Sequence, residues 1–301
     1  MIWFKAGRRC KRCNLPLWGS YVKAMNAEWH AECWRCSRCQ ELIRGNFFVH
    51  EGQPICEKDY LTEVAPRCSI CGCVLKGSFM HNPFGQCACP AHSQDPKCTS
   101  CQRWLLPEDR IRVGGLYGST PCRACLAGSI DDSRLRSYHN AFGTKALRQL
   151  GLVLGAQAEV AVRLASAAQI RQLKGTEERQ LEGLTETSIY TVNGKESSRE
   201  VKGIVIVGGL AREHFEAVLA HEYGHVWLFL SRLDHPTELL AEGFCELVRH
   251  EWLKQLATPL ALELQTRMCE SKDPIYGDGF RLMEKTWREK GLRGVLGLLG
   301  R

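Results

Sequence analysis

Apolar residues recur at helical spacing along much of the second half of this chain. Their intervals of three and four residues predict helices over 134–150, 212–226 and 239–252, and Ser166 is placed to cap another helix running to Leu173. Pro236 suits the first turn of the helix that contains residues 239–252. The second half is therefore expected to fold around a conventional apolar core.

Between residues 150 and 212, three short segments have the pattern of β-strands. Residues 159–164 alternate between polar and apolar positions, and residues 187–192 and 201–207 are rich in β-branched side chains. Asn193-Gly194 lies between the last two segments and is typical of a tight hairpin turn. The expected fold class is α+β, with a small mixed sheet beside the helices.

The first half lacks this periodicity and is rich in cysteine. Fifteen of the seventeen cysteines precede residue 126, mostly in Cys-x2-Cys pairs with interleaved histidine. Such pairs are typical of zinc thiolates in a reducing compartment, whereas cysteines in a small secreted protein favour disulfides. We expect structural zinc and a cytoplasmic location, with disulfides as the alternative.

Eight residues of ligand type lie in a regular register that makes two tetrahedral zinc sites. The first set is Cys10, Cys13, His30 and Cys33, and the second set is Cys36, Cys39, Cys56 and Asp59. Trp29 and Trp34 are placed to fill the small core between these sites. The register resembles that of a LIM domain, assigned to residues 8–65, in which zinc supplies much of the folding energy.

A second cysteine array follows and departs from the LIM register in its middle. Its ligands are Cys68, Cys71, Cys89 and His92 for a third zinc, and Cys98, Cys101, Cys122 and Cys125 for a fourth. Cys73, Cys87 and His81 are spare candidates, ranked lower because Cys89-Pro-Ala-His92 has the spacing of a zinc knuckle. This LIM-like module is assigned to residues 66–128, and the last domain to residues 129–301.

The formal charge of +7 lies entirely in residues 1–130, which hold 17 Lys and Arg against 10 Asp and Glu. Thirteen zinc-bound thiolates outweigh four zinc ions and would reduce this charge to about +2. Nucleic-acid binding depends on a strongly basic surface, so the corrected charge favours protein partners for the zinc modules and argues against nucleic acid.

The sequence His221-Glu222-Tyr-Gly-His225 lies in the helix predicted to begin near Arg212. Two histidines at i and i+4 project from one helix face and can bind one zinc, while Glu222 reaches the water on that metal. Glu222 would take the proton of this water as it attacks a peptide carbonyl, and would later protonate the leaving amine. This pattern predicts a zinc peptidase.

The next predicted helix carries Glu242, Glu246 and His250 on one face. Without the two upstream histidines, a solvated acidic face would be the preferred explanation for two of these residues. With those candidate ligands in place, a third ligand is expected here. We assign Glu242 to the catalytic zinc together with His221 and His225, the gluzincin arrangement. Glu246 would accept a hydrogen bond from a liganding histidine. The alternative exchanges the roles of the two glutamates.

Two further expectations concern the substrate. Residues 201–207 are predicted to form the sheet edge that binds an extended peptide. Residues 273–281 are expected to form a glycine-rich loop before a helix through Trp287, where Tyr276 or Arg281 would stabilise the oxyanion. A capped turn with a packed tyrosine is the alternative for this loop.

Taken in order, the LIM register, Cys89-Pro-Ala-His92, His221-Glu-Tyr-Gly-His225, Glu242-Gly-Phe-Cys245 and Tyr276-Gly-Asp-Gly-Phe-Arg281 resemble the DA-one family of LIM-domain peptidases. This resemblance implies a gluzincin-like (zincin-like) endopeptidase that cuts selected regulatory proteins. It also implies ubiquitin or ubiquitin ligases as partners, because plant members are activated by ubiquitination and carry ubiquitin-interacting motifs before the LIM domain. Only nine residues precede Cys10, so these motifs are expected to be absent.

No apolar run approaches the ~20 residues that span a bilayer, and the first residues lack the apolar core of a signal peptide. We therefore expect no membrane association. The leading interpretation is a zinc endopeptidase with four structural zincs and one catalytic zinc, whose LIM modules recognise proteins or restrain the active site. The alternative is an inactive LIM-containing adaptor. Cys245 and Cys269 are expected to be buried packing residues.

Overall fold

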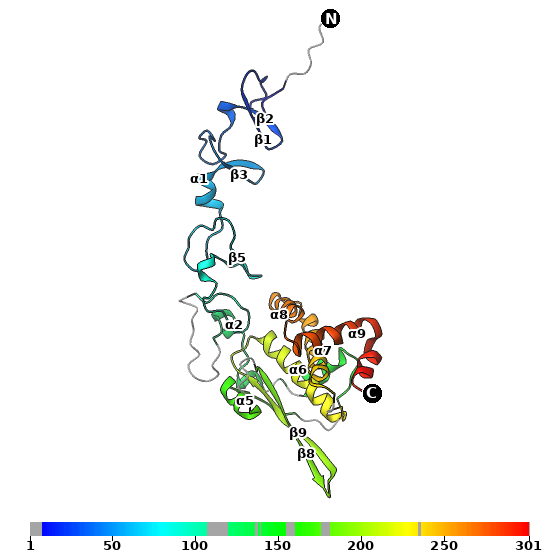
Figure 1. Ribbon diagram of the computed structural model, residues 1–301. Helices are drawn as coiled ribbons and strands as arrows, with labels where there is room; N and C mark the ends of the chain where they lie inside the picture. Colours follow the sequence, from blue (N-terminus) through cyan, green and yellow to red (C-terminus); the bar gives the residue numbers. More distant parts are fainter. Residues whose placement is uncertain are drawn as a thin grey trace. The chain divides into compact units, whose positions relative to one another are not determined.

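The computed structural model describes residues 8–106, 120–135, 138, 140–154, 160–175, 181–233 and 236–300. The chain forms two compact units, the first from residues 1–81 and 87–93 and the second from residues 82–86 and 94–301 (Figure 1). The division falls inside the LIM-like array, so the third cysteine group belongs to the first unit and the fourth to the second. No described helix is long and apolar enough to cross a membrane.

The described part of the first unit contains short antiparallel hairpins and single helical turns. The hairpins pair β1 Tyr21–Ala24 with β2 Ala27–His30, β3 Phe47–His50 with β4 Gln53–Cys56, and β5 Met80–His81 with β6 Cys87–Ala88. The helical turns are η1 Ala31–Cys33, α1 Glu57–Asp59, η2 Tyr60–Val64 and η3 Pro90–His92. These elements are too short to bury a large core, as expected of metal-dependent modules.

Each cysteine group begins with a Cys-x2-Cys pair, and these four pairs form the same backbone turn. The residue after the second cysteine has a positive φ in every case: Asn14, Gln40, Gly72 and Gln102. The third expected ligand of every site is the N-cap of a short helix: His30, Cys56, Cys89 and Cys122. The sequence repeat is therefore a fourfold structural repeat, which extends from the first unit into the second.

The small core of the first unit forms around Trp34, Ile43 and Ile55, with Trp29 packed against it. The ring centroids of the two tryptophans are 5.2 Å apart. The expected role of these tryptophans in the core is thus confirmed.

The second unit is mostly helical. Its helices are α2 Arg123–Ala127, α3 Asp132–Leu135, α4 Asn140–Arg148, α5 Ala167–Lys174, α6 Arg212–Leu230, α7 Glu238–Leu256, α8 Pro259–Glu270 and α9 Tyr276–Leu298. Helix α6 lies at the centre of the main apolar core, where Phe215, Leu219 and Tyr223 are almost fully buried. The predicted start of this helix at Arg212 is confirmed, as is the Ser166 cap of α5.

Strands β7 Val162–Ala165, β8 Gly183–Val192 and β9 Lys195–Val207 form a mixed sheet in the order β7-β9-β8. Strand β9 runs parallel to β7 and antiparallel to β8, so the predicted mixed sheet is confirmed. Asn193 and Gly194 form the hairpin turn with φ of 52° and 75°. Part of the first predicted strand, Glu159, lies outside the described residues.

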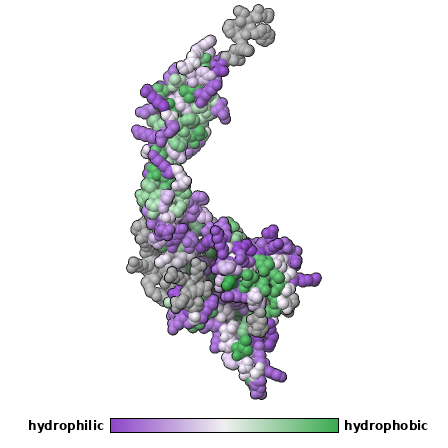
Figure 2. All heavy atoms as spheres, viewed as in Figure 1, coloured by the Kyte–Doolittle hydropathy of each residue, from purple (hydrophilic) through white to green (hydrophobic). Residues whose placement is uncertain are grey.

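The expectation that residues 201–207 form a sheet edge is wrong. These residues belong to β9, in which residues 204–206 pair with β7 on one side and with β8 on the other, whereas β8 is an edge strand of the described sheet. The hairpin of β8 and β9 extends away from the helices of its unit (Figure 1). Ile189 and Val192 on this hairpin are exposed, and Figure 2 shows apolar atoms among polar ones there.

Several helix boundaries also differ from the predictions. Residues 134–150 hold the end of α3 and then α4 instead of one helix, and residues 136, 137 and 139 of this segment lie outside the described part. Pro236 precedes the N-cap Thr237 of α7 and is not in the first turn. The expected loop over 273–281 is helical from Tyr276 onwards, because Asp273 Oδ1 accepts hydrogen bonds from the amides of Ile275 and Tyr276.

Helices α7 and α9 cross with their backbones in contact. A Cβ atom on Gly243 would collide with the carbonyl group of Gly279, and one on Gly279 would collide with the carbonyl oxygen of Leu239. Only glycine allows this approach. The crossing brings the start of α9, with Tyr276, beside the face of α7 that carries Glu242.

Candidate metal centre

Helix α6 places both histidines of the HExxH sequence at one point. His221 and His225 are one helical turn apart, and their Nε2 atoms lie 3.2 Å from each other. The His221 side chain is 11% exposed and the His225 side chain is 28% exposed. The pair therefore faces a partly open space from the edge of the core.

Helix α7 brings Glu242 to the same point. Its Oε2 atom lies 3.1 Å from His221 Nε2 and 3.4 Å from His225 Nε2. The two helices approach closely because a Cβ atom on Gly224 would be 2.9 Å from Cys245 Sγ. The glycine inside the HExxH sequence thus allows α7 to approach closely enough to bring the Glu242 carboxylate to the two histidines.

These three donor atoms fit a zinc ion. Tetrahedral zinc with ligands at ~2.0–2.1 Å separates neighbouring donor atoms by about 3.4 Å, close to the three distances observed. Glu242 Oε2 is buried and accepts no hydrogen bond within the described part of the chain. A buried carboxylate oxygen without a donor is costly, and a cation at the centre of this triangle would satisfy it.

Cys245 lies in the same neighbourhood, grouped with the two histidines. Its thiol is fully buried, and burial, aided by the carboxylates of Glu242 and Glu222, raises its pKa well above the ordinary value. Glu242 Oε2 lies 3.1 and 3.4 Å from the two histidine Nε2 atoms, so Glu242 fits the third position better. Cys245 packs against Gly224 between the helices, whereas Cys269 is exposed, contrary to expectation.

Glu246 supports His221 from the side opposite to Glu242. Its Oε1 atom lies 2.8 Å from His221 Nδ1. Burial alone would lower the pKa of His221, but the contacts with Glu242 and Glu246 outweigh it and raise that pKa to about 10. Arg249 Nη1 lies 3.4 Å from Glu246 Oε1, and its charge helps to keep the buried Glu246 carboxylate ionised by lowering its pKa.

Glu222 is held beside the histidines by strand β8. Thr185 Oγ1 donates a hydrogen bond of 2.7 Å to Glu222 Oε2, and it also lies 3.1 Å from the Glu222 carbonyl oxygen. Gly183 leaves room for the carboxylate, which a Cβ atom there would displace. Neither Gly183 nor Thr185 was singled out from the sequence, because 37 residues separate Thr185 from Glu222 and no local pattern marks such a contact.

The two expected oxyanion donors lie in different surroundings. Tyr276 lines both cavities beside the histidines, and its ring centroid is 6.3 Å from that of His221. Arg281 lines neither cavity; its guanidinium donates to the carbonyl oxygen of Ser271 at 2.6 Å and contacts Asp278. The structure therefore brings Tyr276, but not Arg281, to the candidate centre.

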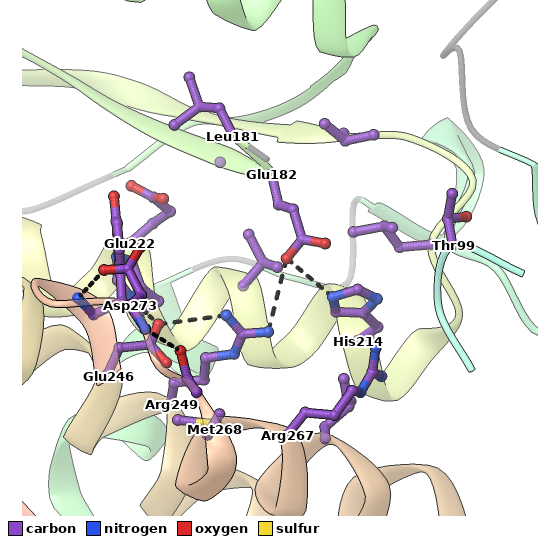
Figure 3. Close-up of a pocket in the computed structure, with 18 of the residues that line it drawn as sticks. Thr99, Leu181, Glu182, His214, Glu222, Glu246, Arg249, Arg267, Met268 and Asp273 are labelled. Carbon is purple, nitrogen blue, oxygen red and sulfur yellow. Dashed lines mark hydrogen bonds and ion pairs between the residues drawn. The ribbon is translucent and has the colours of Figure 1, made fainter. Parts of the chain in front are cut away.

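The larger of these cavities has a volume of about 630 Å³ and continues from the histidines towards His214. Glu182 Oε2 lies 3.0 Å from His214 Nε2 and 3.7 Å from Arg249 Nη2. In Figure 3, His214 and Arg249 both point towards Glu182, with Glu222 and Glu246 on one side and Thr99 on the other. These charged groups give the cavity a polar lining.

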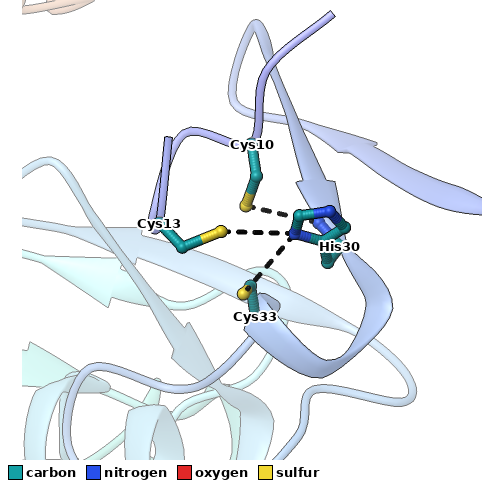
Figure 4. Close-up of side chains that lie close together, drawn as sticks. All are labelled: Cys10, Cys13, His30 and Cys33. Carbon is teal, nitrogen blue, oxygen red and sulfur yellow. Dashed lines mark hydrogen bonds between the residues drawn. The ribbon is translucent and has the colours of Figure 1, made fainter. Parts of the chain in front are cut away.

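The cysteine groups assemble largely as predicted, and none of the seventeen cysteines forms a disulfide. Three groups hold the expected residues with mutually close ligand atoms: Cys10, Cys13, His30 and Cys33; Cys36, Cys39, Cys56 and Asp59; Cys98, Cys101, Cys122 and Cys125. In the first group Cys13 Sγ and Cys33 Sγ lie 3.3 and 3.9 Å from His30 Nδ1, and Cys10 Sγ accepts a hydrogen bond from the His30 backbone amide (Figure 4). His30 Nε2 lies 3.0 Å from the carbonyl oxygen of Pro16, a contact that orients the ring.

The third group differs from the expected set. Its mutually close residues are Cys68, Cys71, Cys89 and Cys73, with Cys73 Sγ 3.3 Å from Cys71 Sγ. His92 lies outside this group but still interacts with Cys71, whose pKa is lowered to about 6, mainly by Cys73 and also by His92. The other spare candidates, Cys87 and His81, pair across the β5–β6 hairpin and do not join it.

Two segments of the chain match the models of known protein families. The family model of the LIM domain matches residues 10–64, and the family model described as Protein DA1 matches residues 144–271. Protein DA1 of Arabidopsis thaliana is 24% identical over 96% of this chain and 66% of its own length. The LIM domain-containing protein HDR3 of Oryza sativa subsp. japonica is 27% identical over 84% of this chain and 57% of its own length. Protein DA1-related 1 of Arabidopsis thaliana is 25% identical over 82% of the chain and 51% of its own length.

The molecule is a LIM-domain protein with a second, mixed helical and sheet unit that carries a cluster of metal-ligand residues. The two family matches and the extent of the similarity narrow this class of protein to one family. These findings support the DA1 family, the DA-one family of the sequence resemblance, with a LIM domain at residues 10–64. It spans between about half and two thirds of the length of these relatives.

Proposed function

We propose that this protein is a zinc-dependent endopeptidase of the gluzincin type. The observation that carries the proposal is the triangle of His221 Nε2, His225 Nε2 and Glu242 Oε2, with edges of 3.1 to 3.4 Å. Two histidines from one helix and a glutamate from the next, with a glutamate between the histidines, form the donor set of a catalytic zinc with an open position.

Each residue of the centre has a role that follows from its position. His221, His225 and Glu242 would hold the ion, and Glu246 would fix the ring of His221 through Nδ1. Bound zinc would lower the pKa of a water molecule to about 7 and polarise the substrate carbonyl. Glu222, anchored at Oε2 by Thr185, would take a proton from the attacking water and deliver it to the leaving amine.

The substrate would bind along β8. This strand is at the edge of the sheet, and its residues Gly183, Leu184 and Thr185 line the smaller cavity together with both histidines. An extended peptide can add to such an edge through backbone hydrogen bonds, which places its carbonyl beside the metal. Tyr276, on the opposite helix, is the candidate donor to the developing oxyanion.

The zinc modules of the first unit would select protein partners in the cytoplasm. Their metal positions would all be filled by protein ligands, which leaves recognition as their role. Ubiquitin or a ubiquitin ligase is the partner that the family resemblance suggests.

Zinc content and cleavage of a proteome-derived peptide mixture, analysed by mass spectrometry, test the proposal. We expect about five zinc ions per chain, and Glu222→Gln should keep them while reducing cleavage by at least about 100-fold, the usual contribution of a general base. Glu213→Gln on the same helix is the matched control, because Glu213 lines neither cavity. Four zinc ions per chain, or equal cleavage by wild type and Glu222→Gln, would favour the adaptor instead.

A further inference from the structure

The fourth cysteine group differs from the others in its surroundings. All four of its residues are buried, with Cys98 and Cys101 exposed by 0% and 2% and Cys122 and Cys125 by 5% and 6%. Each of the other three groups contains at least one exposed cysteine. The fourth group therefore lies inside a core, whereas the others lie at the surface of small modules.

That core is built by the helices around the candidate metal centre. The cysteines share one apolar cluster with Ala217 of α6, Leu253 of α7, Leu264 of α8 and Phe280 of α9. Helices α6, α7, α8 and α9 thus each contribute to the apolar cluster that contains the fourth group. An ion held there would tie these four helices together.

Ser100, between Cys98 and Cys101, makes the most specific of these connections. Its Oγ atom accepts a hydrogen bond of 3.0 Å from the amide of Ala211, the N-cap residue of α6. Its carbonyl oxygen accepts a hydrogen bond of 2.7 Å from Arg267 Nη2 on α8. Ser100 is 0% exposed, so no water can replace these bonds.

The same turn forms part of the cavity wall. Thr99 and Gln102 line the cavity that also contains His221, Glu222 and Arg267. Thr99 Oγ1 and Arg267 Nε are buried there without a hydrogen-bond partner in the described part of the chain. Figure 3 shows Thr99 and Arg267 at the far end of this cavity from Glu222.

We propose that the fourth cysteine group is a structural part of the catalytic unit, and that Ser100 is a positioning residue for the active site. Metal at this group keeps the Cys98–Gln102 turn in shape. The turn then holds the start of α6 through Ala211 and holds Arg267 in the cavity wall. Loss of metal here loosens α6 and the cavity, whereas loss of metal from the first two groups leaves them intact. The effect on cleavage rests on the proposed function; the effect on α6 does not.

Hydrogen exchange and zinc content of the full chain test this division. Cys125→Ser and Cys39→Ser should each lose one zinc, since each removes a ligand of one group. In Cys125→Ser the amides of residues 211–217 should exchange at least about tenfold faster and the second unit should melt at a lower temperature. In Cys39→Ser both should match the wild type. Equal exchange of these amides in the two variants would overturn the proposal.

A second pair of variants leaves all metal ligands in place and serves if Cys125→Ser does not fold. Ser100→Ala removes the acceptor of the Ala211 amide and should speed exchange at the start of α6 by about tenfold, as expected for one buried donor left unpaired. Thr99→Val is the control for this readout, because the Thr99 hydroxyl has no hydrogen-bond partner among described residues. Identical exchange in Ser100→Ala and Thr99→Val, with unchanged zinc content, would refute the positioning role.

Cleavage separates this proposal from the proposed function. If the wild type cleaves peptides, Ser100→Ala should lower kcat/KM at least about tenfold while retaining all zinc. If the wild type cleaves nothing but the exchange differences appear, the proposed function fails and the structural role of the fourth group stands. If the wild type cleaves and neither Ser100→Ala nor Cys125→Ser changes exchange or cleavage, the role assigned to the fourth group is wrong.

Discussion

The two units use cysteine in opposite ways. In the first unit, apolar burial is limited to a small cluster around Trp34, Ile43 and Ile55, and the cysteine groups lie at the surface. In the second unit, a large apolar core surrounds α6, and the fourth cysteine group is buried within an adjoining cluster. The backbone turn around the Cys-x2-Cys pair that begins each cysteine group is nevertheless the same in both units.

This difference shows that the contribution of metal binding to the folding free energy depends on how much apolar surface is buried around the cysteine group. The local backbone turn alone does not determine it. Where little apolar surface is buried, metal binding must supply most of the folding free energy. Where helices already bury Phe215, Leu219 and Tyr223, metal binding adds to a core that can form without it. The units should therefore respond differently to the same perturbations.

The largest contrast is expected on removal of zinc. In a chelator, the amides of β1 to β4 should lose all protection from hydrogen exchange, because structural zinc contributes about 10 kcal/mol or more to small modules. The amides of β9, α7 and the middle of α6 should stay protected in the same sample. Restored protection of β1 to β4 after zinc is added back serves as the control. Persistent protection of β1 to β4 without zinc would show that the first unit does not depend on zinc more than the second unit does.

A smaller effect, confined to the second unit, is expected where α7 and α9 cross. Gly243→Ala places a methyl group against the carbonyl group of Gly279 and should destabilise this unit by about 1–3 kcal/mol, the usual cost of overpacking. Gly297→Ala is the matched control, because a Cβ atom there meets no neighbour within 4 Å. Thermal unfolding of both variants measures the difference. If they unfold alike, the close crossing does not contribute as described.

Much of the candidate centre could be predicted because its signals are local. The spacing of His221 and His225, and of Glu242 and Glu246, places each pair on one face of a helix, and the structure brings the two faces together. Cysteine spacing likewise anticipates three of the four groups, because ligand geometry limits the loop lengths between knuckles.

Contacts between distant segments could not be predicted in this way. The position of β9 at the centre of the sheet depends on its pairing with β7, which follows from the whole topology and not from the composition of the strand. The link from Ser100 to Ala211 spans 111 residues. Helix α8, in contrast, was missed although Thr258 and Pro259 form a recognisable start, with Thr258 accepting a hydrogen bond from the Ala261 amide.

The smallest expected effect concerns the third cysteine group and sharpens the comparison within the first unit. Here the structure places Cys73 nearest to Cys68, Cys71 and Cys89, although His92 was expected to be the fourth ligand. The fourfold repeat argues for His92. It lies three residues after the N-cap ligand Cys89, as Cys33, Asp59 and Cys125 lie after the N-cap ligands of their own sites.

Cys73, in contrast, lies five residues after the first cysteine of its turn. Leu15, Glu41 and Arg103 fill this position in the other turns, where each carbonyl oxygen accepts a hydrogen bond from the first cysteine. We therefore expect His92→Ala to lose about one zinc ion and to loosen only β5 and β6, because each group closes its own loop. Cys73→Ser should retain all the zinc. Zinc content and hydrogen exchange of the two variants decide between the residues, and loss of zinc only in Cys73→Ser would show that proximity, not the repeat, identifies the ligand.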